Sequence, residues 1–233
     1  MNNEKIREKH RKKNRDMFNS IAKRYDFLNR FLSFGTDKIW RKTAIKKLNI
    51  EKHNIILDLA TGTGDLAKEA LKKKPAAVIG IDPAHEMIKR TKMKLPNKYF
   101  AVEGYAEFLP FKQLTFDRAM IAYGIRNFSD RKTALHEIFR VLKKGSLFGI
   151  LEFSESRSAV FRHIYKVYFN KILSKIGGWV SKNKEAYKYL PESVSGFVSP
   201  EALAKECEEA GFQTIEIKPI FTGITSFILL KKP

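Results

Sequence analysis

Apolar residues recur along the chain with two alternating kinds of spacing. Steps of three and four residues between Phe18 and Leu32 predict an amphipathic helix, and a second helix is expected through 40–48. Beyond residue 50, short apolar runs that are typical of buried strands alternate with helical patterns. The predicted strands cover 55–59, 77–81, 99–102, 118–122 and 147–153, and the predicted helices cover 66–73, 85–94 and 132–142. Strands separated by helices of this length predict βαβ units and a mostly parallel sheet.

The C-terminal third follows a different pattern. A helical stretch rich in basic and aromatic residues at 159–175 runs up to a break at Gly177 and Gly178, and a helix at 200–210 comes later. Two strands, 214–219 and 225–230, close the chain, and the connection between them is too short for a helix. We therefore expect these strands to pair antiparallel at the end of a Rossmann-like α/β sheet.

Length and composition fit one globular domain. The chain has 233 residues, of which 43% are hydrophobic. It contains no run of the roughly 20 apolar residues that a spanning helix needs, and no apolar segment follows its charged N-terminus, so we expect a cytoplasmic protein. A single cysteine, Cys207, lies in a helical pattern, where we interpret it as a small buried filler without a functional role. No metal site is expected.

Positive charge changes the expectation about partners. The chain has 45 Lys and Arg against 25 Asp and Glu, a net charge of +20. Such a charge favours anionic partners, either nucleic acid or an anionic lipid surface. The excess gathers in two segments, 5–15 and 157–188. A high lysine content is also typical of proteins from hot habitats, which would explain the total charge but would explain its clustering less well.

The stretch ILDLATGTGDL, residues 56–66, carries the first candidate chemistry. It predicts a buried strand, a tight turn with glycines at 62 and 64, and the start of a helix. In a doubly wound sheet, this first turn is where the backbone approaches a nucleotide-like ligand. Asp82 ends the next predicted strand, where a carboxylate can accept both hydroxyls of a ribose. A dinucleotide fingerprint would have glycine where Ala67 stands, and the antiparallel closing strands also favour a different nucleotide-like cofactor.

Several further strings, in this order and spacing, carry a resemblance to a known family. They are MFNSIAKRYDFLNRFLSFGTDKIWR, LDLATGTGDL, GIDPAHEMI, AEFLPF, YGIRNFSD, RVLKKG, LEFS and YKYLPESV. From Met17 to the C-terminus the chain resembles the UbiE/COQ5 family of quinone-biosynthesis C-methyltransferases. The resemblance implies a class I methyltransferase fold with a seven-stranded sheet, S-adenosylmethionine as cofactor, and methylation of a ring carbon of a polyprenylated benzoquinol or naphthoquinol.

The resemblance also implies a set of cofactor-binding residues. Family contacts carry over to Thr63 in the glycine turn, to Asp82, and to the pair Tyr105 and Ala106 before the glutamate of AEFLPF. Family members often have Asn or Asp at position 105 and Ser at position 122, whereas this chain has Tyr105 and Ala122. The full candidate cofactor-binding set is Asp58, Gly62, Thr63, Gly64, Asp82, Tyr105, Ala106 and Ala122.

Methylation of a ring carbon requires the neighbouring hydroxyl to be ionised or nearly so, and a phenolic hydroxyl has a pKa near 10. Arg126 follows the predicted strand 118–122, and its cation would lower the pKa of a nearby phenol. We expect Arg126, Asn127 and Tyr25 to form the catalytic group, with Tyr25 able to donate a hydrogen bond to the quinol or simply to pack in the core. His163 is a secondary candidate for the proton acceptor.

We divide the single domain into an N-terminal helical extension (1–50), a cofactor-binding core (51–153), a helical substrate lid (154–198) and a closing helix and strands (199–233). Basic residues beside the apolar stripe of 159–175 suit contact with an anionic membrane surface, a lid over an apolar tunnel, or an ordinary core helix. Peripheral contact with the inner face of the cell membrane and a homodimer are left open. The main alternative is an RNA methyltransferase, although no RNA-binding motif accompanies the basic segments. A non-catalytic cofactor-binding or membrane-coat protein is a third.

Overall fold

A computed structural model describes residues 2–33, 35–95, 98–154, 193–220 and 223–233. Its strands form one seven-stranded sheet in the order β3-β2-β1-β4-β5-β7-β6. The strands are β1 (Ile55–Leu59), β2 (Ala77–Asp82), β3 (Tyr99–Glu103), β4 (Phe116–Ala122), β5 (Leu142–Phe153), β6 (Gln213–Ile220) and β7 (Thr225–Lys231). The first five pair in parallel, while β7 pairs antiparallel with both β5 and β6. The predicted parallel sheet with an antiparallel close is thus confirmed.

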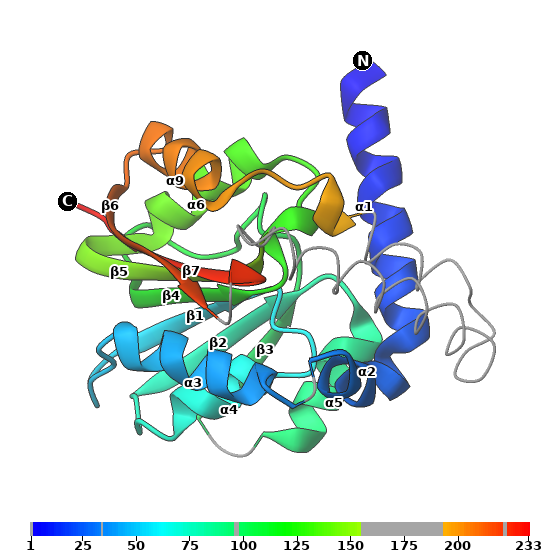
Figure 1. Cartoon of the computed structure of the whole chain (residues 1–233), viewed down its shortest axis with the longest axis horizontal. Coiled ribbons are helices and arrows are strands. Elements are labelled where there is room, and N and C mark those ends of the chain that lie inside the picture. The colour runs from blue at the N-terminus through cyan, green and yellow to red at the C-terminus, as the bar shows by residue number, and fades with distance from the viewer. Residues whose placement is uncertain (1, 34, 96–97, 155–192, 221–222) are drawn as a thin grey trace.

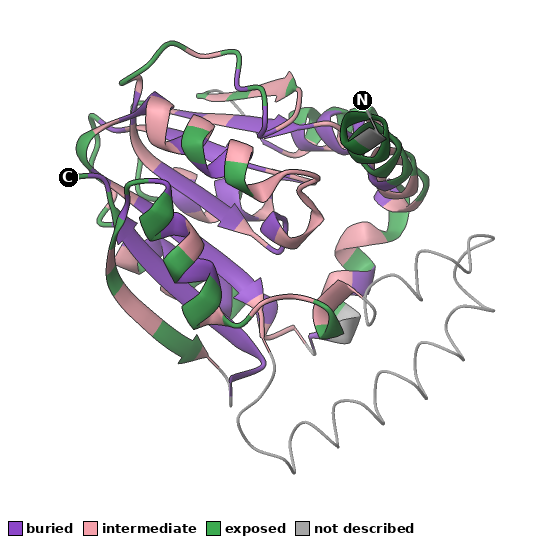
Figure 2. Cartoon of the chain, turned by 90° about the horizontal axis from the view of Figure 1, so that it is seen from above, coloured by how far each residue is buried: buried purple, intermediate pink, exposed green. Residues whose placement is uncertain are grey.

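Helices cover both faces of the sheet (Figure 1). The helices are α1 (Asn2–Ile21), α2 (Tyr25–Leu32), α3 (Asp37–Lys47), α4 (Asp65–Leu71), α5 (His85–Lys94), α6 (Arg131–Val141) and α9 (Pro200–Glu209), with 3-10 turns η1 (Ala22–Arg24) and η2 (Ile125–Asn127). The elements α3 and α4 lie on one face, and α6 and α9 lie on the other. Figure 2 shows the strands buried between these two layers, with exposed residues on the outer sides of the helices.

Each face of the sheet has its own apolar core. On the α6 and α9 side, the fully buried residues include Phe116, Phe148 and Leu135. On the α3 and α4 side, Trp40, Leu48 and Phe227 pack together. A strand whose side chains are buried on both faces reads as a continuous apolar run, which is why the strand pattern could be recognised in the sequence.

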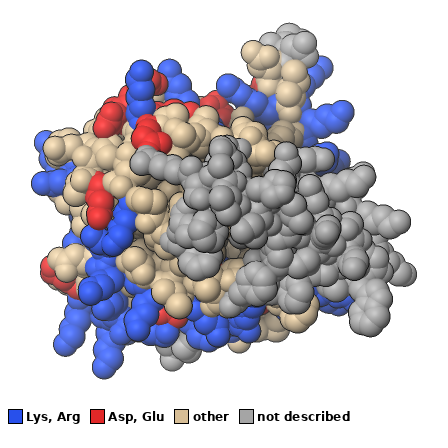
Figure 3. All heavy atoms as spheres, in the orientation of Figure 1, with Lys and Arg blue, Asp and Glu red and all other residues tan. Residues whose placement is uncertain are grey.

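The N-terminal helices differ from the sequence prediction. The structure has one helix from Asn2 to Ile21, a 3-10 turn at Ala22–Arg24, and a separate helix α2, where a single helix from Phe18 to Leu32 was expected. Lys, Arg and Glu are good helix formers, and the first 33 residues contain neither Gly nor Pro, so the charged segment 5–15 continues the helix. Most side chains of this segment are exposed, and Figure 3 shows Lys and Arg along α1 where it projects from the body.

One strand boundary differs from the prediction, and one predicted helical stretch lies outside the described residues. The strand β5 begins at Leu142 and not at the predicted 147, because its first residues pair with β4 across a register shift. The basic-aromatic stretch 159–175 lies outside the described residues. Among the described residues, no helix has both the length and the apolar character needed to cross a membrane.

Candidate active site

The glycine turn joins β1 to α4 at the carboxyl edge of the sheet. Gly62 and Gly64 both have a left-handed backbone, with φ of +56° and +80°. A Cβ atom on Gly64 would lie 2.6 Å from the Thr91 side chain and 2.8 Å from Leu95, so α5 packs directly against the turn. Gly62 faces a more open space, since a Cβ there would have Tyr25 as its nearest neighbour, at 3.7 Å. Both the backbone conformation and the close packing therefore require glycine here.

Asp82 holds this turn to the end of β2. One carboxylate oxygen of Asp82 accepts the backbone N–H of Gly62 at 2.9 Å, and the other accepts the N–H of Ala84 at 2.8 Å. Burial raises the pKa of Asp82 to about 6, while these two backbone donors act in the opposite direction. The expected carboxylate thus stands at the glycine turn, and it stabilises the turn as well as facing the pocket beside it.

Asp58, the single acidic residue in the apolar strand β1, is buried behind the turn. Its carboxylate accepts a hydrogen bond from the Thr61 hydroxyl at 2.5 Å, and Thr61 also contacts the hydroxyl of Tyr99 at 3.0 Å. Burial, together with the nearby Asp82 charge, raises the pKa of Asp58 to about 7. Asp58 therefore organises the turn from behind.

A pocket opens beside the turn, with about 710 Å³ of space when its mouth is included. Seven residues that were predicted from the sequence to bind cofactor or act in catalysis line it: Tyr25, Gly62, Asp82, Tyr105, Ala106, Ala122 and Asn127. Asp58, Thr63, Gly64 and Arg126 are not among the residues that line it. The structure thus brings the carboxyl ends of β1, β2 and β4 and the loop after β3 around one cavity.

The helix α1 covers one side of this pocket, which the sequence analysis missed. Arg11, Asn14, Arg15 and Phe18 are pocket-lining residues. Asn14 is buried and donates its amide N–H to the backbone carbonyl of Asn127 at 3.1 Å. The spacing of residues 7, 11, 14, 15 and 18 marks one helix face, and this signal was present in the sequence but hidden by the surrounding charge.

Pairs of polar groups attach α1 at both ends of the pocket. Near the start of α6, Arg7 forms an ion pair with Asp130 at 2.7 Å, and Arg11 donates to the Ser129 hydroxyl at 3.3 Å. At the far end, the Asn19 side chain accepts the backbone N–H of Glu86 at the start of α5, at 2.9 Å. The helix therefore bridges α5 and α6 across the mouth of the pocket.

Arg126 lies in the loop after β4, but it does not stand as a free cation. Its guanidinium forms an ion pair with Glu152 at 2.8 Å, and the exposed fractions of the two side chains are 6% and 4%. Glu152, near the end of β5, was not predicted as a site residue. Burial raises its pKa, and the Arg126 charge and hydrogen bonds oppose that rise. The guanidinium also donates to the Tyr123 carbonyl and lies 5.4 Å from the Phe153 ring centre.

Tyr25 begins α2, and its ring lies beside the glycine turn, 3.7 Å from the position of a Cβ atom on Gly62. Burial raises the pKa of Tyr25, while a hydrogen bond with the Asn29 side chain and the Arg126 charge oppose the rise. At neutral pH the Tyr25 hydroxyl therefore keeps its proton and can donate a hydrogen bond. Its ring also packs edge-on against Phe18, with the ring centres 6.2 Å apart, so the packing role and the pocket-lining role coexist.

The pocket suits an adenosine-type cofactor. Gly62 offers backbone without a side chain, Asp82 offers a buried carboxylate at a strand end, and the walls at Tyr105 and Ala106 include an aromatic ring. A sheet in this order with a glycine turn after β1 and an acidic end to β2 defines the class I methyltransferases.

Comparisons with known proteins assign the family. Residues 5–230 match the model of the ubiE/COQ5 methyltransferase family. A relative from Geotalea daltonii, "Ubiquinone/menaquinone biosynthesis C-methyltransferase UbiE", is 43% identical over 91% of this chain and 92% of its own. A "Demethylmenaquinone methyltransferase" from Chlorobaculum tepidum is 42% identical over 92% and 90%. The chain belongs to the ubiE/COQ5 methyltransferase family.

Solved structures agree on the fold. A SAM-dependent methyltransferase from Thermotoga maritima superposes with a TM-score of 0.66 at 22% identity, covering 93% of this chain and all of its own. One from Aquifex aeolicus has the same TM-score at 16% identity, covering 92% and 98%. The expected class I fold is confirmed. The chain is a methyltransferase, and S-adenosylmethionine is its cofactor, as expected.

Proposed function

We propose that this methyltransferase transfers a methyl group from S-adenosylmethionine to a ring carbon of a polyprenylated quinol. Relatives named as a ubiquinone/menaquinone biosynthesis C-methyltransferase and a demethylmenaquinone methyltransferase support this proposal. A single observation carries the proposal. Residues predicted for the cofactor and residues predicted for the quinol line one pocket, with Tyr25 beside Gly62 in its wall. The naphthoquinol of menaquinone synthesis is the first substrate to test, because it is common to both names.

The cofactor end is formed by Gly62, Asp82, Tyr105 and Ala106, with Ala122 beside them. The cofactor, when bound, supplies an activated methyl group. Asp82 accepts the ribose hydroxyls, and the glycine turn gives the cofactor's amino acid part access to the backbone. Thr63 turns its hydroxyl to Asp26, so it acts on the site by holding the turn and not by lining the pocket.

At the substrate end, Tyr25 donates its hydroxyl proton in a hydrogen bond to the quinol oxygen. Such a bond favours the electron-rich form of the ring, because negative charge on the oxygen strengthens it. Arg126 also favours the ionised quinol, but its charge is largely offset at a distance by Glu152. Its contribution therefore depends on close approach of the substrate oxygen, and Asn127, at the pocket wall, orients that oxygen.

We include peripheral membrane contact in the proposal, since a polyprenylated substrate resides in lipid. The exposed basic residues of α1 support it, as this helix projects beyond the body of the protein (Figure 3). Flotation with anionic vesicles, but not with zwitterionic ones, is the expected result. A homodimer and the division of the chain into extension, core and lid stay predictions, and sedimentation velocity tests the first of these.

The experiment that tests the reaction offers methyl-labelled cofactor together with a prenylated demethylnaphthoquinol, a prenylated benzoquinol or total RNA. Label is expected in the naphthoquinol product. This product should form only when the substrate is supplied in its reduced form, because the quinol hydroxyl activates the ring. Label in RNA alone would favour the alternative function, which the family assignment does not support. Label in the benzoquinol alone would move the protein to the ubiquinone pathway.

A further inference from the structure

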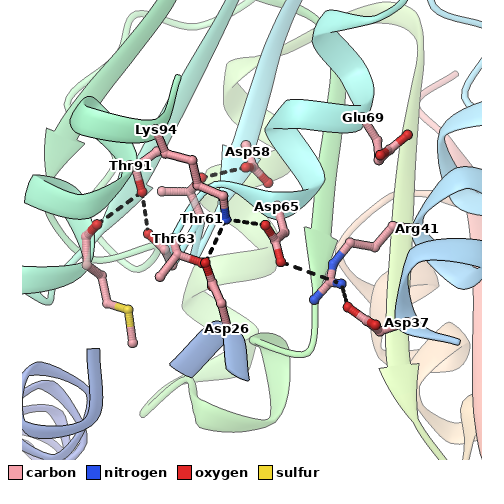
Figure 4. A network of polar contacts seen from close by, with 12 residues as sticks. Asp26, Asp37, Arg41, Asp58, Thr61, Thr63, Asp65, Glu69, Thr91 and Lys94 are labelled. Carbon is pink, nitrogen blue, oxygen red and sulfur yellow. Dashed lines mark hydrogen bonds and ion pairs between the residues drawn. The ribbon is translucent and has the colours of Figure 1, made fainter. Parts of the chain in front are cut away.

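A network of polar contacts lies around the glycine turn (Figure 4). Thr63 donates its hydroxyl to one carboxylate oxygen of Asp26, and Lys94 donates to the other at 2.9 Å. The Lys94 ammonium also binds Asp65, the first residue of α4. Arg41 of α3 lies 3.9 Å from Asp65 and forms an ion pair with Asp37. The network thus links α2, α3, α4 and α5 to one turn.

Asp26 has a special place in this network. It directly follows Tyr25, whose ring lies beside Gly62, so neighbouring residues of α2 contact neighbouring residues of the turn. Thr63 is 3% exposed, whereas the Asp26 side chain is 31% exposed, so the hydrogen bond satisfies a buried hydroxyl from a more open carboxylate. Loss of the Asp26 carboxylate would remove this hydrogen-bond acceptor from the buried Thr63 hydroxyl, which is unfavourable.

The charges of the network balance one another. Its carboxylates are Asp26, Asp37 and Asp65, and they face the cations Arg41 and Lys94 and, at Asp65, the charge of Arg30. Lys94 neutralises the two carboxylates nearest the turn without entering the pocket.

We infer that Asp26 is a positioning residue that couples the cofactor turn to Tyr25 through its hydrogen bond with Thr63. This inference rests on the proposed cofactor site. Asp26 contacts the glycine turn and is adjacent to Tyr25 in α2. A well-ordered glycine turn therefore fixes the start of α2, and a well-ordered start of α2 likewise fixes the glycine turn. Binding of cofactor therefore sets the substrate-side hydroxyl in place, without a separate closing step.

Calorimetry with S-adenosylmethionine on four proteins tests the coupling. Asp26→Ala is expected to weaken cofactor binding about tenfold, because one buried hydrogen bond is lost. Thr63→Val should have a similar effect, and the double variant should bind about as weakly as the weaker single variant, since both changes remove the same bond. Additive losses in the double variant would overturn the inference.

Two further variants separate positioning from plain stability. Asp26→Asn keeps an oxygen acceptor for Thr63 but removes the ion pair with Lys94, so its affinity should stay within about threefold of wild type although its melting temperature falls. Equal losses in the Asn and Ala variants would mean that charge, and not the Thr63 bond, is what matters. Glu69→Ala is the matched control, because it removes a carboxylate of α4 that pairs at the surface with Lys72.

Hydrogen exchange of the α2 amides supplies the second readout. Cofactor is expected to slow exchange over 25–32 in wild type and in Asp26→Asn, and to leave it unchanged in Asp26→Ala at saturating cofactor. Protection in the Ala variant equal to that in wild type would overturn the coupling. If wild type itself does not bind S-adenosylmethionine, the proposed cofactor site fails, and this outcome is distinct from failure of the inference.

Discussion

The glycine turn and the Arg126 loop follow neighbouring parallel strands, β1 and β4, yet they stabilise charge in different ways. At the glycine turn, the Asp82 carboxylate is held by two backbone N–H groups. In the Arg126 loop, a buried guanidinium is held by a carboxylate 26 residues further along the chain. Backbone donors come with the turn itself, whereas an ion pair requires a second side chain. We therefore expect the two regions to respond differently when one charge is removed.

The largest effect is expected at Arg126. Replacement by Gln should lower turnover about 100- to 1000-fold, because a preorganised electrostatic contact is lost. The same change leaves Glu152 buried without its cation, which should reduce the free energy of unfolding by about 3–5 kcal/mol. Steady-state kinetics and urea unfolding measure the two effects separately.

A double variant, Arg126→Gln with Glu152→Gln, sharpens this prediction. It should recover most of the stability, since no unpaired charge remains, but it should not recover turnover. Turnover of the Gln variant should also improve at higher pH, where the quinol ionises without help. Restored turnover in the double variant would show that the pair acts only through the stability of the loop.

A smaller effect is expected at Asp82. Asp82→Ala removes both acceptors, so the N–H groups of Gly62 and Ala84 lose their partners and the ribose loses its carboxylate. The dissociation constant for S-adenosylmethionine should rise about 10- to 100-fold, which corresponds to roughly 1–3 kcal/mol. Isothermal calorimetry measures it, with the exposed Asp16→Ala as control. Unchanged affinity would remove Asp82 from the cofactor site.

The same contrast explains what could be read from the sequence. Strand β1 and helix α5 have the predicted bounds, because apolar periodicity and turn residues are local signals. The Asp82 contact also follows from local geometry, since the ends of adjacent parallel strands meet at one edge. The expectation of a methyltransferase was confirmed through this region together with the family-specific strings.

The residues that were missed depend on distant partners. Glu152 lies within the apolar strand β5, and nothing in its sequence neighbourhood indicates that it pairs with Arg126. Asp26 looks like an ordinary polar position of an amphipathic helix until α5 brings Lys94 to it. The helix α1 was hidden because its pocket-lining Asn14 and Arg15 lie among exposed charges. The roles of Glu152, Asp26 and helix α1 all depend on tertiary contacts between segments that lie more than 20 residues apart in the sequence.

Packing of the turn gives a third effect, on stability and not on binding. Gly64→Ala must accept a left-handed backbone and place a Cβ atom 2.6 Å from Thr91, so it should reduce the free energy of unfolding by about 1–3 kcal/mol beyond the backbone strain. Gly145→Ala is the matched control, because Gly145 has φ of +74° and no atom within 4 Å of the added Cβ. It should cost only the strain, about 1–2 kcal/mol. Equal melting temperatures for the two variants would mean that α5 yields without cost.

The smallest effect concerns pH at Asp82. Burial raises the pKa of this carboxyl to about 6, and only the ionised form can accept both ribose hydroxyls. Protons therefore compete with the cofactor, and affinity should fall about tenfold per pH unit as pH drops below 6. The cofactor's own amino and carboxyl groups, with pKa values near 8 and 3.5, do not titrate between pH 5 and 7.

Stability of the free protein should move in the opposite direction over the same range. The folded pKa values of Asp58 and Asp82, about 7 and 6, lie above the unfolded value of 3.8, so the folded state binds more protons than the unfolded chain. These two groups therefore make the free energy of unfolding increase as pH falls from 7 toward 4, by up to about 1.4 kcal/mol per pH unit and group. Asp58→Asn separates the two groups, because the affinity loss below pH 6 should persist in it. Asp82→Asn should bind weakly with a flat pH dependence, and a slope equal to that of wild type in this variant would assign the titration to another group.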